Sequence, residues 1–577
     1  MADPLHTIAA TLREAFAGVT GLEAASIDPV VRPSERADAQ ANGALALAKQ
    51  VGRNPRELAE EVVATGALVG VCSSVEVAGP GFINLTFTES FLAGEVVKAA
   101  SDGHLGVRPA EIAETAVVDY SAPNVAKEMH VGHLRSTVIG DSLVRLLEFV
   151  GHRVIRENHI GDWGTPFGML IEQLVDLGLD AGEAIDAADP NAFYQAARAR
   201  FDADDDFRDR ARDRVVKLQS GDPETLALWR ELVHNSTQYF NTVYLTLGVL
   251  LDDGDLMGES AYHSLLPEVI ERLDALGLLE QSEGADVVFP PGFTNRDGDP
   301  LPLIVQKGHG GFNYATSDLA CVIDRVERLG ATLLLYVVGA PQAQHLSMVF
   351  EVARMAGWLK PPARAVHVAF GSVLGPDRKM YKTRSGENVK LQALIDEGVQ
   401  RATVTVAERA ELSAAEKEAV ARAVGSGAIK YADLSSDRVK DYIFDWDRML
   451  AFDGNTAPYL QYAHARICSI FRKAGVERSS VRGITPTVGE PQERALALQV
   501  LQFDAVVHDT IDKFSPHKLC TYLFDLAQSF TSFYEACPVL RPGHEATREG
   551  RLALCDVTAR VLEQGLALLG IAAPERM

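Results

Sequence analysis

Hydrophobic positions at the start of the chain follow a helical periodicity and then a strand periodicity. Apolar residues recur at helical spacing over residues 5–17 and 41–49, whereas residues 75–85 are typical of a strand, a Gly-Pro-Gly turn and a second strand. Residues 101–108, which follow, have the composition of a linker. The pattern predicts a small N-terminal α+β domain over residues 1–108.

From residue 116 onward, short apolar runs alternate with amphipathic helical segments. Such alternation is typical of right-handed βαβ units that build a parallel sheet. We therefore expect an α/β domain over residues 109–390, interrupted around residues 170–302 by an insertion rich in charged helix. The expected strands are residues 116–120, 154–159, 333–338 and 365–370, and the expected helices are residues 134–149 and 343–356.

Helical periodicity dominates the rest of the chain, apart from a Gly- and Pro-containing loop at residues 481–491. We divide this all-helical part into a connecting region, residues 391–445, and a terminal domain, residues 446–577. A chain of 577 residues is too long for one hydrophobic core, which agrees with a division into several domains.

Composition and charge narrow the class of protein. Hydrophobic residues make up 47% and charged residues 23% of the chain, as in ordinary globular proteins. No segment reaches the roughly 20 apolar residues of a membrane span, and a signal peptide is not evident, so we expect a cytoplasmic protein without a membrane segment. The six scattered cysteines, none in a Cys-x-x-Cys pair, predict neither structural zinc nor disulfides. The net charge of −24 disfavours RNA binding, although a local basic face can still hold RNA.

The segment between the first expected strand and its helix carries His130-Val131-Gly132-His133. Ligands of open α/β sheets bind at the carboxyl ends of strands, and a helix N-terminus offers N–H groups and a positive dipole to phosphate. Gly132 would let adenine or phosphate approach the backbone, and the imidazoles would donate to triphosphate oxygens. The motif predicts an ATP site that stabilises attack on the α-phosphate. Taken alone, the spacing is equally compatible with a structural role, and a metal site would need a third ligand nearby.

The residues around this motif resemble the first signature of class I aminoacyl-tRNA synthetases, in the form found in arginyl enzymes. The likeness starts with Ser-Ala-Pro-Asn-Val-Ala-Lys-Glu-Met-His-Val-Gly-His at residues 121–133 and continues through Asn-His-Ile-Gly-Asp-Trp-Gly-Thr-Pro-Phe-Gly at residues 158–168. It returns in Phe-Asp-Trp-Asp-Arg-Met-Leu at 444–450, Gly-Asn-Thr-Ala-Pro-Tyr-Leu-Gln-Tyr at 454–462 and Glu-Arg-Met at 575–577. Most relatives have Gln where this chain has Pro166. The resemblance covers nearly the whole chain, although residues 170–301 contribute little.

The resemblance implies an arginine–tRNA ligase. Such an enzyme activates L-arginine with ATP and Mg²⁺ to arginyl-adenylate, transfers the arginine to the 3′ end of tRNA-Arg, and releases AMP and pyrophosphate. Bound tRNA is generally needed for the first step. The resemblance also implies a Rossmann-like catalytic domain, an N-terminal tRNA-binding domain, a stem-contacting region at residues 391–445 and an anticodon-binding domain at residues 446–577. We expect a monomer.

A second signature follows the last expected strand, in the basic segment Arg-Lys-Met-Tyr-Lys-Thr-Arg-Ser-Gly at residues 378–386. A loop there could close over the triphosphate and neutralise charge in the transition state, although a basic run alone is more often a solvated turn. The segment resembles Lys-Met-Ser-Lys-Ser, with Tyr381 and Thr383 in place of the serines. The resemblance assigns catalysis to Lys127, Lys379 and Lys382 and an ATP contact to Met380.

A guanidinium presents a planar fork of donors, so a selective pocket needs carboxylates and carbonyl acceptors in fixed positions. Tyr314 and Asp318 are spaced to face one side of a helix, although without the resemblance a core tyrosine and a surface aspartate would be the simpler interpretation. Polar contacts of this kind can reject analogues by about 10⁴ without editing, which agrees with the absence of an evident editing domain. The resemblance assigns arginine binding to Asp119, Asn124, Tyr314, Asp318 and Gln342.

Aromatic and basic side chains outside the α/β domain are candidates for RNA contacts. Phe82 and Asn84 could stack against and hydrogen-bond an unpaired base, with the D-loop as the target that the resemblance implies; Phe82 could equally be a core strand residue. In the helical domain an aromatic and basic set suits a splayed anticodon, although most such aromatics belong to cores. That set consists of Tyr459, Tyr462, Arg466 and Tyr534, with the terminal Met577.

Three other functions fit parts of the pattern. A nucleotidyltransferase of the same superfamily would make an adenylate without RNA, but its kind usually lacks a large helical C-terminal domain. A class I synthetase for another amino acid would share both signatures without an arginine pocket. A non-catalytic RNA-binding paralogue should have lost His130, His133 or the lysines, all of which are present.

Overall fold

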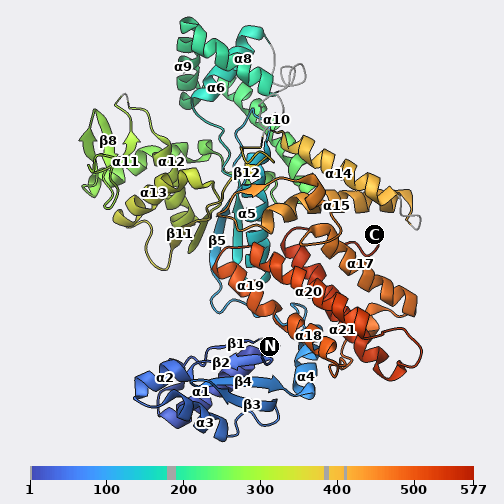
Figure 1. Ribbon diagram of the computed structural model, residues 1–577. Helices are drawn as coiled ribbons and strands as arrows, with labels where there is room; N and C mark the ends of the chain where they lie inside the picture. The colour runs from blue at the N-terminus through green and yellow to red at the C-terminus, as the bar shows by residue number, and fades with distance from the viewer. Residues whose placement is uncertain (1–2, 35, 179–189, 309, 382–388, 408–411) are drawn as a thin grey trace.

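The computed structural model describes residues 3–34, 36–178, 190–308, 310–381, 389–407 and 412–577. The N-terminal unit and the helical insertion lie at opposite ends of the molecule, with the parallel sheet between them and the C-terminal helices packed along one side (Figure 1). None of the helices in the described part of the chain combines the length and the apolar composition that a bilayer crossing demands.

The N-terminal unit is an antiparallel sheet, in the strand order β1-β2-β4-β3, packed with helices. Asp3 caps its first helix by accepting a hydrogen bond from Leu5 N at 2.9 Å, and Gly21 ends that helix with a φ of 74°. The expected strand–turn–strand is the hairpin of β3 and β4. The elements are α1 (Pro4–Thr20), β1 (Val31–Pro33), β2 (Ala39–Ala41), α2 (Ala44–Val51), α3 (Pro55–Ala64), β3 (Cys72–Ala78), β4 (Phe82–Phe87) and α4 (Glu89–Ser101).

The central sheet is parallel, in the order β11-β10-β5-β6, and all of its strands were expected from the sequence. Side chains of β5 alternate between two cores: Ala116 and Val118 belong to the core that contains α5, and Val117 belongs to the core of α12 and α13. Helices therefore cover both faces of the sheet. The elements are β5 (Thr115–Asp119), α5 (Val131–Phe149), β6 (Arg153–Glu157), α12 (Tyr314–Ile323), β10 (Leu333–Tyr336), α13 (Ala343–Met355) and β11 (Arg364–His367).

The insertion is helical in its first part and not in its second. It is rich in helix as expected, and it also contains β7 and β8, which the sequence did not predict and which form an antiparallel sheet with β9. Pro166 lies in the first turn of α6, where proline removes no helical hydrogen bond. The elements are α6 (Thr165–Leu177), α8 (Pro190–Ala203), α9 (Asp205–Ser220), α10 (Pro223–Leu247), α11 (Leu266–Ala275), β7 (Glu280–Ser282), β8 (Ala285–Val288) and β9 (Leu303–Gln306).

The C-terminal part is helical as expected, except that β13 (Tyr442–Ile443) pairs in parallel with β12 (Val373–Leu374). A single apolar core runs from α5 through α15 and α17 to α20 and α21, so the sheet and the C-terminal helices share their interior. The helices are α14 (Leu391–Ala407), α15 (Ala414–Leu434), α16 (Trp446–Met449), α17 (Ala457–Ala474), α18 (Pro491–Leu501), α19 (Phe503–Asp512), α20 (His517–Ala536) and α21 (Glu545–Leu568).

Candidate active site

The loop between β5 and α5, residues 120–130, is called the signature loop below, and it ends in a helix cap built by both histidines. His130 is the N-cap residue of α5, and its Nδ1 accepts a hydrogen bond from Gly132 N at 3.0 Å. His133 Nδ1 accepts one from His130 N at 3.1 Å, and the two ring centroids lie 4.1 Å apart. Because each Nδ1 is an acceptor, each neutral ring carries its proton on Nε2, a donor suited to a phosphate oxygen.

Gly132 is required by the first histidine. A Cβ atom at this position would lie 2.7 Å from His130 Cε1 and 2.9 Å from His130 Nδ1. The nearest neighbour of Gly132 is therefore the His130 ring, whereas we expected Gly132 to leave room for adenine or phosphate.

Both histidines are uncharged at neutral pH. Burial lowers the pKa of His133 to about 3, with His130 and Lys127 acting in the same direction. Burial and Lys127 also lower the pKa of His130. Positive charge for a triphosphate must therefore come from other side chains.

The second signature begins in a short hairpin that starts with β12. The backbone of Met380 pairs with Leu374, so Lys379 and Met380 stand at an exposed turn. The Tyr381 ring stacks on Phe444 with centroids 4.8 Å apart, which gives the residue that replaces a serine a packing role. Lys382 and Thr383 lie outside the described residues.

The chain returns from the second signature directly beside the first. Val131 N donates a hydrogen bond to Val389 O at 2.9 Å, and Leu391 N donates one to Met129 O at 2.8 Å. The two bonds form an antiparallel bridge at His130. Main-chain hydrogen bonds thus join the first signature to residues 389–391, which follow the second signature in the chain.

Lys127, in the signature loop, approaches the insertion. Its Nζ lies 4.2 Å from the centre of the Tyr194 ring of α8. The side chain is half-buried, so its charge is held close to the start of the first signature and not in open solvent.

Tyr314 and Asp318 share one partner, His345 of α13. Asp318 Oδ2 and His345 Nε2 are 2.5 Å apart, and the Tyr314 ring meets the His345 ring edge-on with centroids 4.7 Å apart. Tyr314 is 63% exposed and lines a cavity of about 230 Å³ together with His345. Gln342 is exposed at the N-cap of the same helix as His345. Sequence reasoning missed His345, although it stands within one turn of Gln342.

An acidic group from the insertion faces this cluster. Burial, followed by the carboxylates of Asp162 and Asp318, raises the pKa of Glu259 to about 7, against the opposing effect of His159. Burial also raises the pKa of Asp162. A guanidinium placed here would favour the ionised carboxylates. Sequence reasoning missed Glu259 because it belongs to no motif and lies where the resemblance contributes little.

Asp119 and Asn124 lie at the β5 end of the site. Asp119 Oδ2 accepts a hydrogen bond from Arg325 Nη2 at 2.8 Å, so one oxygen of this predicted arginine ligand is paired inside the protein. Asn124 is exposed in the signature loop. Burial raises the pKa of the Cys321 thiol, and both Asp318 and Asp119 add to the effect. The two carboxylates therefore lie within electrostatic reach of one group.

Metal-binding side chains do not cluster in the described ranges. No group of three His, Cys, Asp or Glu residues there is arranged to hold a metal ion. All six cysteines are free thiols. The expectation of no structural zinc stays a prediction.

Comparison with known families matches three parts of the chain. A model of "tRNA synthetases class I (R), catalytic domain" matches residues 96–446, one of "Arginyl tRNA synthetase N terminal domain" matches residues 5–87, and one of "DALR anticodon binding domain" matches residues 460–577. The chain belongs to the arginyl-tRNA synthetase family. The resemblance inferred from the two signatures is confirmed.

Relatives of this arginyl-tRNA synthetase family member align over its full length. The arginine–tRNA ligase of Thermobifida fusca is 55% identical over 579 residues and covers 100% of both chains, and that of Cellvibrio japonicus is 48% identical over 96% of each. The arginyl-tRNA synthetase structure from Plasmodium falciparum superposes with a TM-score of 0.83 at 28% identity, covering 99% of both chains. That from Thermus thermophilus gives 0.81 at 25% identity, covering 99% and 100%. The expected fold class is confirmed.

The N-terminal residues that we expect to contact RNA share one face of β4. Phe82 and Asn84 are half-buried and alternate with Ile83 and Leu85, which are fully buried. Asn84 Oδ1 accepts a hydrogen bond from Gln40 Nε2 at 2.8 Å. Phe82 is therefore not a core residue of its strand, which leaves an RNA contact open to it.

The helical residues that we expect to contact RNA are partly in contact with each other. The Arg466 guanidinium carbon lies 4.6 Å from the centre of the Tyr534 ring. Tyr459, Tyr462 and Arg466 have the spacing of one face of α17. Tyr462 is 38% exposed, whereas Tyr459 packs against the core. Met577 packs against a small core under α14 and α15.

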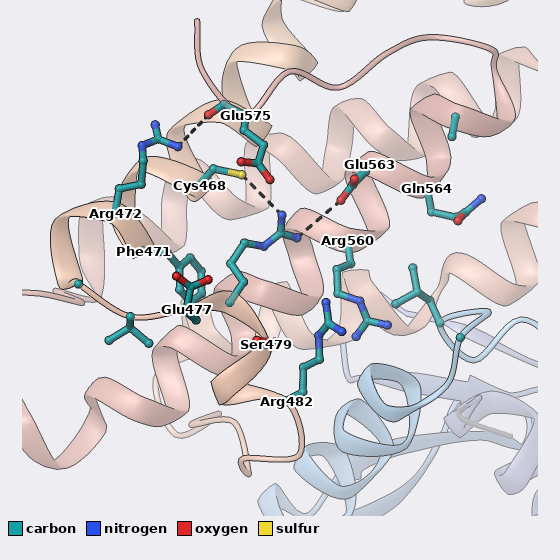
Figure 2. A pocket seen from close by; sticks show the side chains of 16 residues that line it. Cys468, Phe471, Arg472, Glu477, Ser479, Arg482, Arg560, Glu563, Gln564 and Glu575 are labelled. Atoms are coloured by element: carbon teal, nitrogen blue, oxygen red, sulfur yellow. Dashed lines mark hydrogen bonds and ion pairs between the residues drawn. The ribbon is translucent and has the colours of Figure 1, made fainter. Parts of the chain in front are cut away.

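A charged cavity, of about 870 Å³, lies among the C-terminal helices of this family member and next to the linker that precedes β5 (Figure 2). Arg472 donates to the Glu575 carbonyl oxygen at 3.0 Å. Arg478 lies 3.1 Å from Asp556 and 3.7 Å from Glu563. The cavity contains none of the predicted site residues, and these two arginines already have partners within the protein.

Proposed function

We propose that this chain, an arginine–tRNA ligase, works in two steps at the carboxyl edge of its parallel sheet. In the first step a carboxylate oxygen of L-arginine attacks the α-phosphorus of ATP, the bond to the β-phosphate oxygen breaks, and pyrophosphate leaves arginyl-adenylate. In the second step a ribose hydroxyl at the 3′ end of tRNA-Arg attacks the adenylate carbonyl, and AMP leaves. The observation that carries the proposal is the hydrogen bonding of the first signature to residues 389–391, which follow the second signature, together with the acidic neighbours of Glu259.

The ATP end of the site supplies neutral donors and separate cations. His130 and His133 offer Nε2 donors to phosphate oxygens, since their lowered pKa values keep both rings neutral. Lys379 and Lys127 bring positive charge from the hairpin turn and from the signature loop. ATP enters with Mg²⁺, which offsets further charge on the triphosphate. The chain accelerates this step by position and charge, without a covalent intermediate on the protein.

The arginine end of the site suits a guanidinium. Asp318 and Glu259 provide carboxylates for its planar donors, with Tyr314 at the rim. His345 occupies one oxygen of Asp318 and so fixes the direction of that carboxylate. The α-amino and carboxylate groups of the substrate would contact Asp119, Asn124 and Gln342. These residues lie near the signature loop and the start of α13.

The tRNA partner is expected to span several domains. Phe82 and Asn84 would meet the D-loop, the helical region 391–445 the stem, and the exposed aromatic and basic residues of α17 and α20 the anticodon. The large negative net charge makes these local surfaces necessary for RNA binding. We place the reaction in the cytoplasm, where translation consumes its product, and the monomeric state stays a prediction.

Aminoacylation of total tRNA with each amino acid in turn tests the proposal. We expect arginine alone to be attached, and arginine-dependent ATP–pyrophosphate exchange to require added tRNA. Attachment of another amino acid would refute the arginine pocket. Exchange without tRNA would favour the nucleotidyltransferase alternative, and tRNA binding without any charging would favour the non-catalytic paralogue.

A further inference from the structure

The signature loop has a strained backbone. Ser121, Ala122 and Ala126 have φ angles of 73°, 47° and 60°, in the left-handed region that residues with a Cβ atom disfavour. Such conformations persist only where surrounding contacts fix them. The loop leads to His130, so its shape determines where the first signature stands relative to the end of β5.

Two of the fixing contacts come from one helix of the insertion, α10. Ser236 Oγ accepts a hydrogen bond from Ala126 N at 2.9 Å. The Tyr244 hydroxyl lies 2.8 Å from Ser121 Oγ and hydrogen-bonds to it. Both side chains are buried, so water does not compete for these bonds. Each bond holds one of the left-handed residues.

The Tyr244 hydroxyl is also the centre of a small network. Asn158 Nδ2 donates to it at 3.0 Å, and Asn158 Oδ1 accepts from Ala122 N at 3.0 Å. Thr137 Oγ1 of α5 donates to Ser121 Oγ at 2.9 Å. The Tyr244 hydroxyl therefore links α10 to the carboxyl ends of β5 and β6 and, through Ser121, to α5.

Contacts away from the loop fix α10 along its length. In its first half Trp229 Nε1 donates to Asp162 O at 2.8 Å. At its end Leu247 O accepts a hydrogen bond from Lys430 Nζ at 2.7 Å, and the same ammonium donates to Gly570 O at 2.6 Å. Figure 1 shows α10 between the insertion helices and the sheet. A shift of the insertion or of the C-terminal helices therefore reaches the signature loop through α10.

We propose that Ser236 and Tyr244 are positioning residues for adenylate formation, through which the insertion sets the shape of the signature loop. They act through Ala126 and Ser121 and are not among the ligands proposed for ATP or arginine. The inference rests on the proposed function, because it concerns the activation step. It gives the insertion, which carries neither signature, a defined part in the reaction.

Tyr244→Phe and Ser236→Ala test the inference in the full-length chain, with Tyr522→Phe and Thr237→Val as matched controls. Tyr522 is a buried tyrosine whose hydroxyl donates to Gln499 O at 3.0 Å in the helical domain. The Thr237 hydroxyl is also buried and donates to His234 O of α10 itself at 2.9 Å. Each control removes a buried hydroxyl without touching the signature loop.

We expect Tyr244→Phe to lower the kcat of tRNA-dependent ATP–pyrophosphate exchange about tenfold and Ser236→Ala about threefold, with the Kd for tRNA within about twofold of the parent value. The controls should keep the parent kcat at a comparable change in Tm. The double variant should lose less than the product of the single losses, because both bonds hold one loop. An unchanged kcat in both variants, or an equal loss in the controls, overturns the inference. A parent chain that does not charge arginine would instead overturn the proposed function.

Discussion

Two charged clusters of this protein, each next to a cavity, differ in how their charges are balanced. The carboxylates of Asp162 and Asp318 lie within electrostatic reach of Glu259, where His159 opposes them, and His345 is hydrogen-bonded to Asp318. Among the C-terminal helices, by contrast, Arg478 is paired with both Asp556 and Glu563, and Arg472 with a backbone carbonyl.

We interpret the difference as one between the proposed arginine site and a cluster that only stabilises the fold. Burial and the nearby carboxylates of Asp162 and Asp318 raise the pKa of Glu259, and a cationic ligand would stabilise its ionised form. Charged groups that are already paired within the fold do not need a ligand for their stabilisation. The cavity lined by Tyr314 and His345 measures about 230 Å³ against about 870 Å³ for the other, so charge balance and not cavity volume supports the proposed arginine site.

Asp318→Asn removes a charge from the unbalanced cluster and has the largest expected effect. We expect kcat/KM for arginine to fall about 10³-fold, mainly through KM, because the guanidinium loses a charged hydrogen-bond partner. Steady-state aminoacylation kinetics measure this change in kcat/KM. The matched change Glu563→Gln in the balanced cavity should leave the KM for arginine within about twofold. Equal KM values for Asp318→Asn and the parent chain would remove Asp318 from the pocket.

Glu259 makes arginine binding dependent on pH. Its pKa of about 7 means that the carboxyl group is half protonated near neutral pH in the free protein. A bound guanidinium favours the ionised form, so binding releases a proton and weakens as the pH falls through about 7. The KM for arginine should rise about tenfold between about pH 8 and about pH 6. Glu259→Gln should show a higher KM that is flat over this range; the same slope in the variant would assign the titration to another group.

His345 has a smaller, indirect effect, because it acts on the ligands of arginine. His345→Ala removes both its bond to Asp318 and its ring contact with Tyr314. We expect the KM for arginine to rise about tenfold, with a partial recovery in His345→Gln, which keeps a donor. No difference between the two variants in a titration of arginine would mean that the hydrogen bond has no part in the orientation of Asp318.

Arg478→Met tests the balanced cavity and should have the smallest effect on the reaction. The change leaves the buried Asp556 carboxylate without its 3.1 Å partner, so we expect the Tm to fall by about 4 °C. The kcat/KM for arginine should stay within about twofold. Arg482, which lies 3.8 Å from Asp556 and is half exposed, provides the control: Arg482→Met should change Tm by less than about 1 °C. A loss of arginine affinity in Arg478→Met would contradict the division between the two cavities.

Local patterns predict the sheet and both signatures well. The strands β5 and β10 are buried on both faces and therefore appear as continuous apolar runs. His130 and His133 are recognisable because their spacing and their place after a strand are local properties. By contrast, β7 and β8 contain three and four residues and are too short to show a periodicity.

Contacts between distant segments could not be predicted from the sequence. Arg325 pairs with Asp119, 206 residues earlier in the chain, and no pattern near either residue indicates that pair. Glu259 meets Asp318 only because the insertion folds back onto α12. The role of Gly132 likewise depends on the rotamer of His130, which spacing does not encode.

The apolar core that α5 shares with α17, α20 and α21 also bears on the modularity of the protein. Ser142 Oγ of α5 donates to Leu568 O at 3.1 Å, so the helix that starts with the first signature is bonded to the end of the last helix. The catalytic family model ends at residue 446, but this position does not separate two independent cores, because the helices on both sides share one. The anticodon-binding domain supplies part of the hydrophobic core beneath α5. Recombination could therefore replace this domain only if the matching core residues of the catalytic domain were replaced with it.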